Sequence, residues 1–253
     1  MKTVNSMGVT LAILFITAHA PLHASSMDER IESAARNSYA FKQYLKADRI
    51  NVHSKDGAVV LTGAVANKYH DALANETVAN LPGVKTVWDS LKVSGNSPVE
   101  YSDEWILVKV ETALLFHRNV SAQNTRVSVK DGIVTLRGKA DNLAQKDLTS
   151  EYVADVEGAK EVKNEMTFAS GEPSLTKKTM EKIDDASITA QVKVSLLLRR
   201  STSALNTHVH TVRGVVNLSG KAGNAAEKDL VTKLASDING VKRVVNDMTV
   251  TAK

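Results

Sequence analysis

Hydrophobic and polar positions follow one plan repeatedly along the chain. Ile106, Val110 and Leu114 recur at the spacing that buries one face of a helix. Residues 125–136 then alternate between apolar and polar types on either side of an Asp131-Gly132 pair. Apolar runs joined through Asp-Gly indicate a β-hairpin, so this copy begins as a helix followed by two strands.

A second helix and a final strand complete each copy. Asn142 is a good helix N-cap, because its side-chain oxygen can accept from a free backbone N–H, and Gln145 stands where a capping box needs it. The pattern predicts that this helix ends at Gly158 and that a strand runs over 159–168. Asp103 is the predicted cap of the first helix.

Three glycines with fixed gaps mark each copy. The gaps are 6 and 20 residues, and the copies are offset by 75 and then 82 residues. Self-similarity at such a period predicts repeated modules. We interpret these glycines as turn residues, not as a phosphate-binding loop. They are Gly57, Gly63 and Gly83, then Gly132, Gly138 and Gly158, then Gly214, Gly220 and Gly240.

The fold class that follows is α+β, with three tandem small αββαβ modules. Each is expected to be a three-stranded mixed sheet with two helices packed on one face. Polar segments rich in Gly, Ser and Pro separate the modules. The predicted divisions are a signal peptide at 1–24, a divergent module at 27–94, a linker at 95–102, a module at 103–169, a linker at 170–182 and a module at 183–252.

The first residues predict export. Lys2 precedes an apolar run over 9–16, and small residues lead to a cleavage site that we place after Ala24. The run is shorter than the roughly 20 residues that span a bilayer. The chain has no cysteine, which excludes lipid attachment at an N-terminal cysteine and also excludes disulfides. We expect a soluble protein of the periplasm.

Charge and motifs narrow the chemistry. The formal net charge is only +4 and both signs are interleaved, so a nucleic-acid partner is not expected. His208 and His210 could share a metal from one strand face, but no third ligand is evident, and an ordinary solvent-facing strand explains them as well. No phosphate-loop or nucleophile motif occurs. We therefore expect no cofactor, no metal and no enzyme.

Three sequence motifs within the copies resemble the BON domain family, which is named for bacterial OsmY-like osmotically induced periplasmic proteins and nodulation proteins. They are the I-x-x-x-V-x-x-x-L helix, the G-x-V-x-L-x-G hairpins from Gly132 and Gly214, and the G-V-x-x-V-x-N segment from Gly240. The first copy departs from the pattern, with polar residues 37–39 in its first helix, expected over 31–45, and Trp88-Asp89 near its end. The resemblance implies an envelope location, a role in osmotic or envelope stress, and no catalytic residues.

The ends of the first helices in copies two and three carry apolar residues followed by cations. Such an edge suits the boundary of an anionic membrane, with indole favouring the same depth. Packing under the sheet or between modules remains the alternative. The candidate lipid-contact residues are Trp105, Leu115, Phe116, Arg118, Leu197, Leu198, Arg199 and Arg200.

Two functions stay open at this stage. One is a protein that binds phospholipid membrane surfaces. The other is a soluble periplasmic chaperone that holds unfolded envelope proteins through apolar patches. The sequence does not identify the ligand or client, the oligomeric state, or whether the modules act singly or together.

Overall fold

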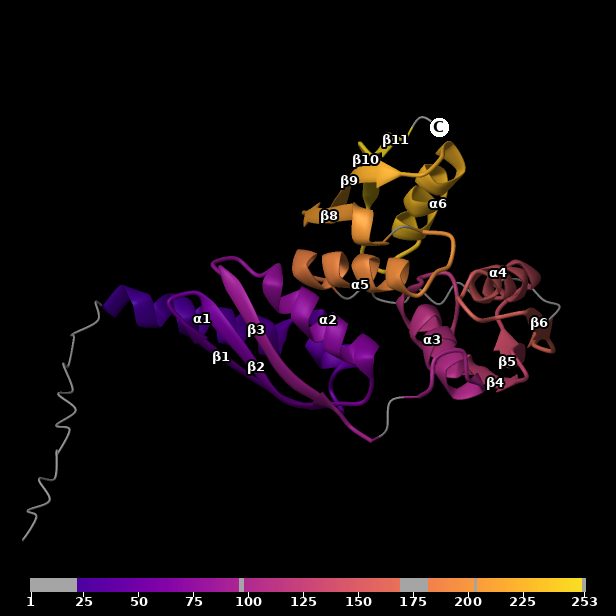
Figure 1. Cartoon of the computed structure of the whole chain (residues 1–253), viewed down its shortest axis with the longest axis horizontal. Coiled ribbons are helices and arrows are strands. Elements are labelled where there is room, and N and C mark those ends of the chain that lie inside the picture. The colour runs from indigo at the N-terminus through magenta and orange to yellow at the C-terminus, as the bar shows by residue number, and fades with distance from the viewer. Residues whose placement is uncertain (1–21, 96–97, 169–181, 203, 252–253) are drawn as a thin grey trace, which may run out of the picture.

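Three αββαβ modules in tandem form the chain (Figure 1). The structure is a computed structural model and describes residues 22–95, 98–168, 182–202 and 204–251. Module 1 contains α1 (Leu22–Asn37), the π-helical turn η1 (Ala40–Tyr44), β1 (Arg49–Lys55), β2 (Ala58–Val65), α2 (Lys68–Ala79) and β3 (Thr86–Val93). Module 2 contains α3 (Asp103–Phe116), the 3-10 turn η2 (Ala122–Asn124), β4 (Thr125–Lys130), β5 (Ile133–Ala140), α4 (Leu143–Ala154), β6 (Glu161–Asn164) and β7 (Thr167–Phe168). Module 3 contains α5 (Asp185–Leu197), the 3-10 turn η3 (Ala204–Asn206), β8 (Thr207–Val212), β9 (Val215–Ala222), α6 (Ala225–Ser236), β10 (Arg243–Asn246) and β11 (Thr249–Val250).

Each sheet is mixed, as predicted. The second strand of the module is central, antiparallel to the first strand and parallel to the last one. The last strand is continuous only in module 1. In module 2 it is interrupted at 165–166, where the Asn164 side chain accepts from the Met166 N–H and donates to the Lys146 carbonyl, and the Met166 side chain enters the core. Asn246 and Met248 repeat this break in module 3.

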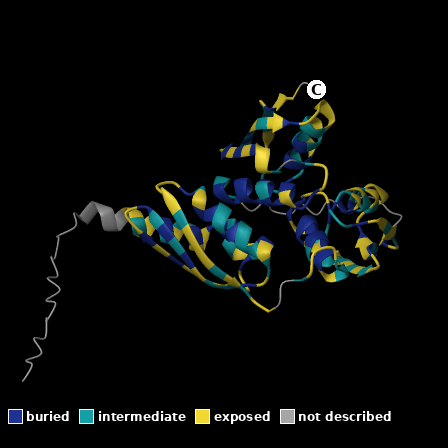
Figure 2. Cartoon of the chain, viewed as in Figure 1, coloured by how far each residue is buried: buried dark blue, intermediate teal, exposed yellow. Residues whose placement is uncertain are grey.

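The recurrent aliphatic columns form the core of each module. Leu61, Leu136 and Leu218 are fully buried on the central strands, on the sheet face that the helices cover. Figure 2 shows buried and exposed residues following one another along the strands, and helix α5 largely buried. Burial on one face of the sheet follows from the alternation of side chains along each strand.

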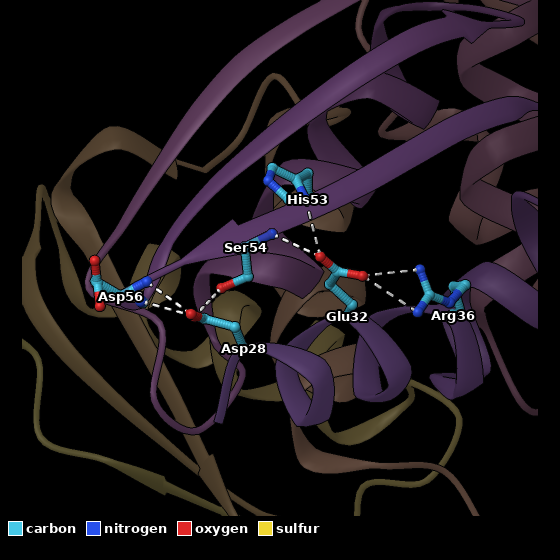
Figure 3. Close-up of polar contacts among 7 residues, drawn as sticks. Asp28, Glu32, Arg36, His53, Ser54 and Asp56 are labelled. Atoms are coloured by element: carbon cyan, nitrogen blue, oxygen red, sulfur yellow. Dashed lines mark hydrogen bonds and ion pairs between the residues drawn. The ribbon is translucent and has the colours of Figure 1, made fainter. Parts of the chain in front are cut away.

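A carboxylate from the first helix holds the hairpin turn in every module. Asp28 accepts from the backbone N–H groups of Asp56 and Gly57 and from the Ser54 hydroxyl, and these bonds lower the pKa of its carboxyl (Figure 3). Asp103 and Asp185 bind the corresponding turns. The prediction that Asp103 caps its own helix is therefore wrong. The cap of α3 is Ser102, whose hydroxyl accepts from the Trp105 N–H, and Asp184 caps α5 in the same way.

The second helix begins as predicted and ends earlier than predicted. Asn142 accepts from the Gln145 N–H, and the Gln145 side chain accepts in return from the Asp141 N–H. Helix α4 ends at Ala154, before Gly158, because a turn intervenes.

The middle glycine of each module lies inside a strand and not in a turn. Gly138 has a φ of +128°, and a Cβ there would lie 1.9 Å from the Asn124 carbonyl oxygen. A close approach of two backbones therefore fixes glycine at this column.

The start of module 1 differs from the expected single helix. Helix α1 ends at Asn37, the chain bends at Ser38, and a π-helical turn follows. Ser38 is buried, and its hydroxyl donates to the Ala35 carbonyl in the last turn of the helix. Residues 1–21 of the predicted signal peptide lie outside the described residues, and 22–24 begin α1.

Candidate functional site

The ends of the first helices join modules 2 and 3 through a two-fold exchange of backbone. His117 forms an antiparallel bridge with Ile238, and Arg199 forms one with Val156. The N–H groups of Glu157 and Asn239 donate to the carbonyls at the opposite helix ends, at 3.1 and 3.0 Å. The residues exchanged are offset by the same 82 positions as the repeat itself. Two homologous modules thus use the same surface patch on each other, as in an isologous dimer.

A polar cluster is buried in this interface. The His117 and Tyr152 rings stack with centroids 3.9 Å apart, and Arg199 Nη2 lies 2.9 Å from His117 Nε2. The Tyr152 hydroxyl donates to Asp237 Oδ2 at 2.5 Å. Burial, together with the Arg199 charge, lowers the pKa of His117 to about 3. A neutral His117 can accept a hydrogen bond from Arg199, so the cluster binds the two modules together near neutral pH.

Module 1 packs against the same assembly through α5. Figure 1 shows α5 lying between the helices of module 1 and the sheet of module 3. Lys193 Nζ of α5 lies 2.6 Å from Glu76 Oε2 of α2, and the Tyr44 ring of module 1 meets the Phe116 ring of module 2 at 5.1 Å. Helix α5 is consequently buried on nearly all sides. Its buried residues are Ala186, Ser187, Ile188, Thr189, Ala190, Gln191, Val192, Val194, Ser195 and Leu196.

The structure divides the eight candidate lipid-contact residues into two groups. Trp105, Phe116, Leu198 and Arg199 are buried, and Leu115, Leu197, Arg118 and Arg200 are exposed. The buried four pack inside or between modules in this structure, which corrects the expectation that they face a membrane. The exposed arginines also act between modules, since Arg118 donates to the Val241 carbonyl and Arg200 to the Ala154 carbonyl.

Trp105 is buried by charged neighbours from two modules. Lys109 Nζ lies 4.0 Å from its ring centroid and 2.6 Å from Glu157 Oε2, so an ion pair covers the indole. Lys68 of module 1 lies 5.4 Å from the same ring. The ion pair and the two cation–π contacts cover the indole, so this tryptophan does not reach solvent.

The second feature with functional potential is the sheet face that the helices leave uncovered. Strand register places the same-face neighbours together, as in the row His53, Val60 and Trp88. Among the charged residues of these faces lysine and arginine dominate, and Glu161 is the single carboxylate at the open-face strand positions of the described residues. The cations are Arg49, Lys55 and Lys92 in module 1, Arg126, Lys130, Arg137, Lys139 and Lys163 in module 2, and Lys221 and Arg243 in module 3.

These faces were missed because the charges look interleaved along the chain. Period-two alternation in each strand sends the cations to one side and the aliphatic residues to the other. The signal was present in segments such as residues 49–55, where basic and polar residues occupy every second position. Arg137 has a partner in Glu165 at the interruption of the last strand, 2.8 Å away.

His208 and His210 lie on the open face of module 3, both exposed on β8. Across the described residues, no cluster of three or more His, Asp or Glu side chains could hold a metal. In the same part of the chain, no helix is both long enough and apolar enough to cross a bilayer.

The three modules each match one known family model. The BON domain model matches residues 27–95, 102–170 and 184–252. This chain belongs to the BON domain family. Among curated BON-like relatives, the osmotically-inducible protein Y of Escherichia coli (strain K12) is 29% identical over 191 residues, which cover 76% of this chain and 92% of that protein. The outer membrane lipoprotein DolP of Haemophilus influenzae is 29% identical over 147 residues, covering 58% of this chain and 73% of DolP.

Among solved structures, the chain is similar to CdsD, described as a structural protein of the Type III secretion system of Chlamydia trachomatis. The identity is 17%, the match covers 89% of this chain and 92% of that one, and the TM-score is 0.25. The three segments that the BON domain model matches coincide with the three modules of the structure.

Proposed function

We propose that this BON protein is a non-catalytic component of the bacterial envelope that binds anionic phospholipid surfaces through the uncovered faces of its sheets. The observation that carries the proposal is the segregation of charge: lysine and arginine occupy these faces almost without carboxylates. The chain as a whole has 32 Lys and Arg against 28 Asp and Glu, so the faces are far more basic than the composition.

Such faces suit a lipid surface for a physical reason. Each Lys or Arg near an anionic bilayer contributes about 1 kcal/mol of attraction, and the attraction falls off within a Debye length. Because several cations share one face, their contributions act together. The names of the relatives, an osmotically inducible protein and an outer membrane lipoprotein, support an envelope role in stress.

The chaperone alternative has weaker support. It requires exposed apolar patches, and Phe116 and Leu198 at the helix ends are buried between modules, although Leu115 and Leu197 there are exposed. Joined by α5 and by the exchanged backbone, the modules also present one assembled surface in place of three separate ones.

Co-sedimentation with vesicles tests the proposal. The full exported chain is mixed at low salt with vesicles of phosphatidylglycerol and phosphatidylethanolamine, or with vesicles of phosphatidylcholine alone. We expect binding to the anionic vesicles only, and release as salt is raised. The absence of binding to anionic vesicles at low salt would overturn the proposal.

A pair of charge-reversal variants locates the surface. Changing Arg49 and Lys92 to Glu alters the open face of module 1, and changing Arg30 and Lys42 to Glu makes the same charge change on the helix layer of the same module. We expect the first variant to lose binding and the second to keep most of it. An equal loss in both would show that net charge, and not the sheet face, determines binding.

A further inference from the structure

Module 1 presents an aromatic side chain on its open sheet face. Trp88 is 66% exposed at the middle of β3. The register places it beside Val60 of β2, which in turn lies beside His53 of β1. At the aligned position modules 2 and 3 have Lys163 and Val245, so this feature distinguishes module 1 from its two copies.

Cations share the open sheet face with the exposed indole. Arg49 and Lys92 belong to one row of the face, across Ala64, and Lys55 lies at the hairpin end. The open-face strand positions of module 1 hold no carboxylate. Glu32 of α1 already has partners, since it accepts from the Ser54 N–H at 2.9 Å and pairs with Arg36 and His53 at the sheet edge (Figure 3).

The central strand supplies an apolar floor between these charges. Its open-face residues are Ala58, Val60, Thr62 and Ala64, and the flanking residues of β3 are Thr86 and Ser90. Because these neighbouring side chains are small, they do not cover the Trp88 ring, which can project outward from the sheet. A soluble polyanion would use only the cations, whereas a bilayer interface accommodates an indole and cations together.

We infer that module 1 is the membrane-docking module of this protein, with the Trp88 indole inserted at the interface of an anionic bilayer and Arg49, Lys55 and Lys92 against the lipid phosphates. This inference rests on the proposed function and names the surface that performs it. It moves the docking surface from the helix ends of modules 2 and 3 to the sheet of the divergent module.

Tryptophan fluorescence tests the inference directly, because the chain has two tryptophans and Trp105 is buried. In a Trp105→Phe variant Trp88 is the sole indole. On adding anionic vesicles we expect its emission to shift to shorter wavelength and to be quenched by brominated acyl chains. In a Trp88→Phe variant, where Trp105 remains, we expect neither change. Because Trp105 is a core residue, Trp105→Phe can perturb the fold, so the unmodified chain is measured as well. Subtracting the emission of Trp88→Phe from that of the unmodified chain then gives the Trp88 signal.

The two failures are distinguishable. If the chain sediments with anionic vesicles while Trp88 emission is neither shifted nor quenched, the inference is overturned and the proposed function stands. If the chain does not sediment at all, the proposed function fails as well.

An affinity comparison supplies a second criterion. We expect Trp88→Ala to weaken vesicle binding about tenfold, since loss of an interfacial indole removes a large contact area. The matched control is Leu205→Ala, which removes a 91% exposed apolar side chain outside the sheets and is expected to leave binding unchanged. Equal affinities for Trp88→Ala and the unmodified chain, or full competition by heparin without any lipid-dependent Trp88 signal, would show that the face binds polyanions and not a bilayer.

Discussion

Replacing Leu198 by alanine tests whether the first-helix ends hold modules together or face lipid. Leu198 is fully buried at the end of α5, and its carbonyl accepts from the Glu157 N–H across the interface at 3.1 Å. Its neighbour Leu197 is 42% exposed. Two adjacent leucines with the same chemistry therefore differ in their surroundings, and each serves as the control of the other.

The expected costs follow from burial. A fully buried Leu→Ala change costs about 3 kcal/mol, because it removes transfer free energy and leaves a cavity between modules that pack on each other. The same change at Leu197 costs about 1 kcal/mol, since much of that side chain is already in water. If the three packed modules unfold as one cooperative unit, the melting temperature should fall by about 6–12 °C for Leu198→Ala and by about 2–4 °C for Leu197→Ala.

Urea unfolding measures both variants in a Trp88→Phe background. The buried Trp105, the remaining tryptophan, then reports module 2, so an effect of Leu198→Ala on its transition is transmitted across the interface between modules 2 and 3. The reasoning is refuted if the two leucines cost the same, or if Leu198→Ala leaves the free energy of unfolding unchanged but weakens vesicle binding. The latter result would mean that the helix end opens toward lipid.

Three further predictions concern pH and backbone. In the folded protein the pKa of His117 is lowered from 6.5 to about 3, so below about pH 6.5 the unfolded chain binds a proton that the folded chain does not, and the free energy of unfolding falls. Urea titrations should show a loss of about 2 kcal/mol at pH 5, and His117→Gln should abolish that loss. Burial and a hydrogen bond to Asp89 raise the pKa of Asp71 to about 6, so the stability that Asp71 contributes is present below the pKa of its unfolded state and is lost as the pH rises through about 6. Asp89→Asn introduces the residue that modules 2 and 3 have at this position, and it should stabilise module 1 by about 1 kcal/mol at pH 7 and by less at pH 5. A larger gain at pH 5 than at pH 7 would contradict this. Gly138→Ala should cost more than about 3 kcal/mol in circular-dichroism melts because its Cβ meets a backbone carbonyl, whereas Gly95→Ala has free space and should cost only the about 1 kcal/mol of its positive φ.

The sequence was a good guide wherever one residue acts on its own neighbourhood. Asn142 caps α4 with the predicted partner, and the two strands joined through Asp131-Gly132 form the predicted hairpin. Errors appeared where a side chain reaches beyond its own element. Asp103 looked like a cap for the helix it begins, but its carboxylate spans 28 residues to bind the Asp131 N–H, an interaction that no local pattern contains.

The candidate site shows the same division more strongly. Leu-Leu followed by Arg is compatible with a membrane edge and with a module interface, and the sequence contains nothing that decides between them. The decision came from packing, because the ends of α3 and α5 meet across a two-fold exchange that buries Leu198 and Arg199. The basic sheet faces were likewise hidden, since strands far apart in sequence had to be aligned before their cations shared a surface.

By itself the sequence determined that this protein is three copies of one αββαβ module, because hydrophobic periodicity, caps and obligatory glycines are local requirements that recur in every copy. Only the tertiary structure decided which surfaces remain free. Modules that share a fold bury part of one another's apolar helix ends, since exposed apolar area is unfavourable in water, and the sheet faces, with Trp88 on one of them, are among the surfaces left open to a partner.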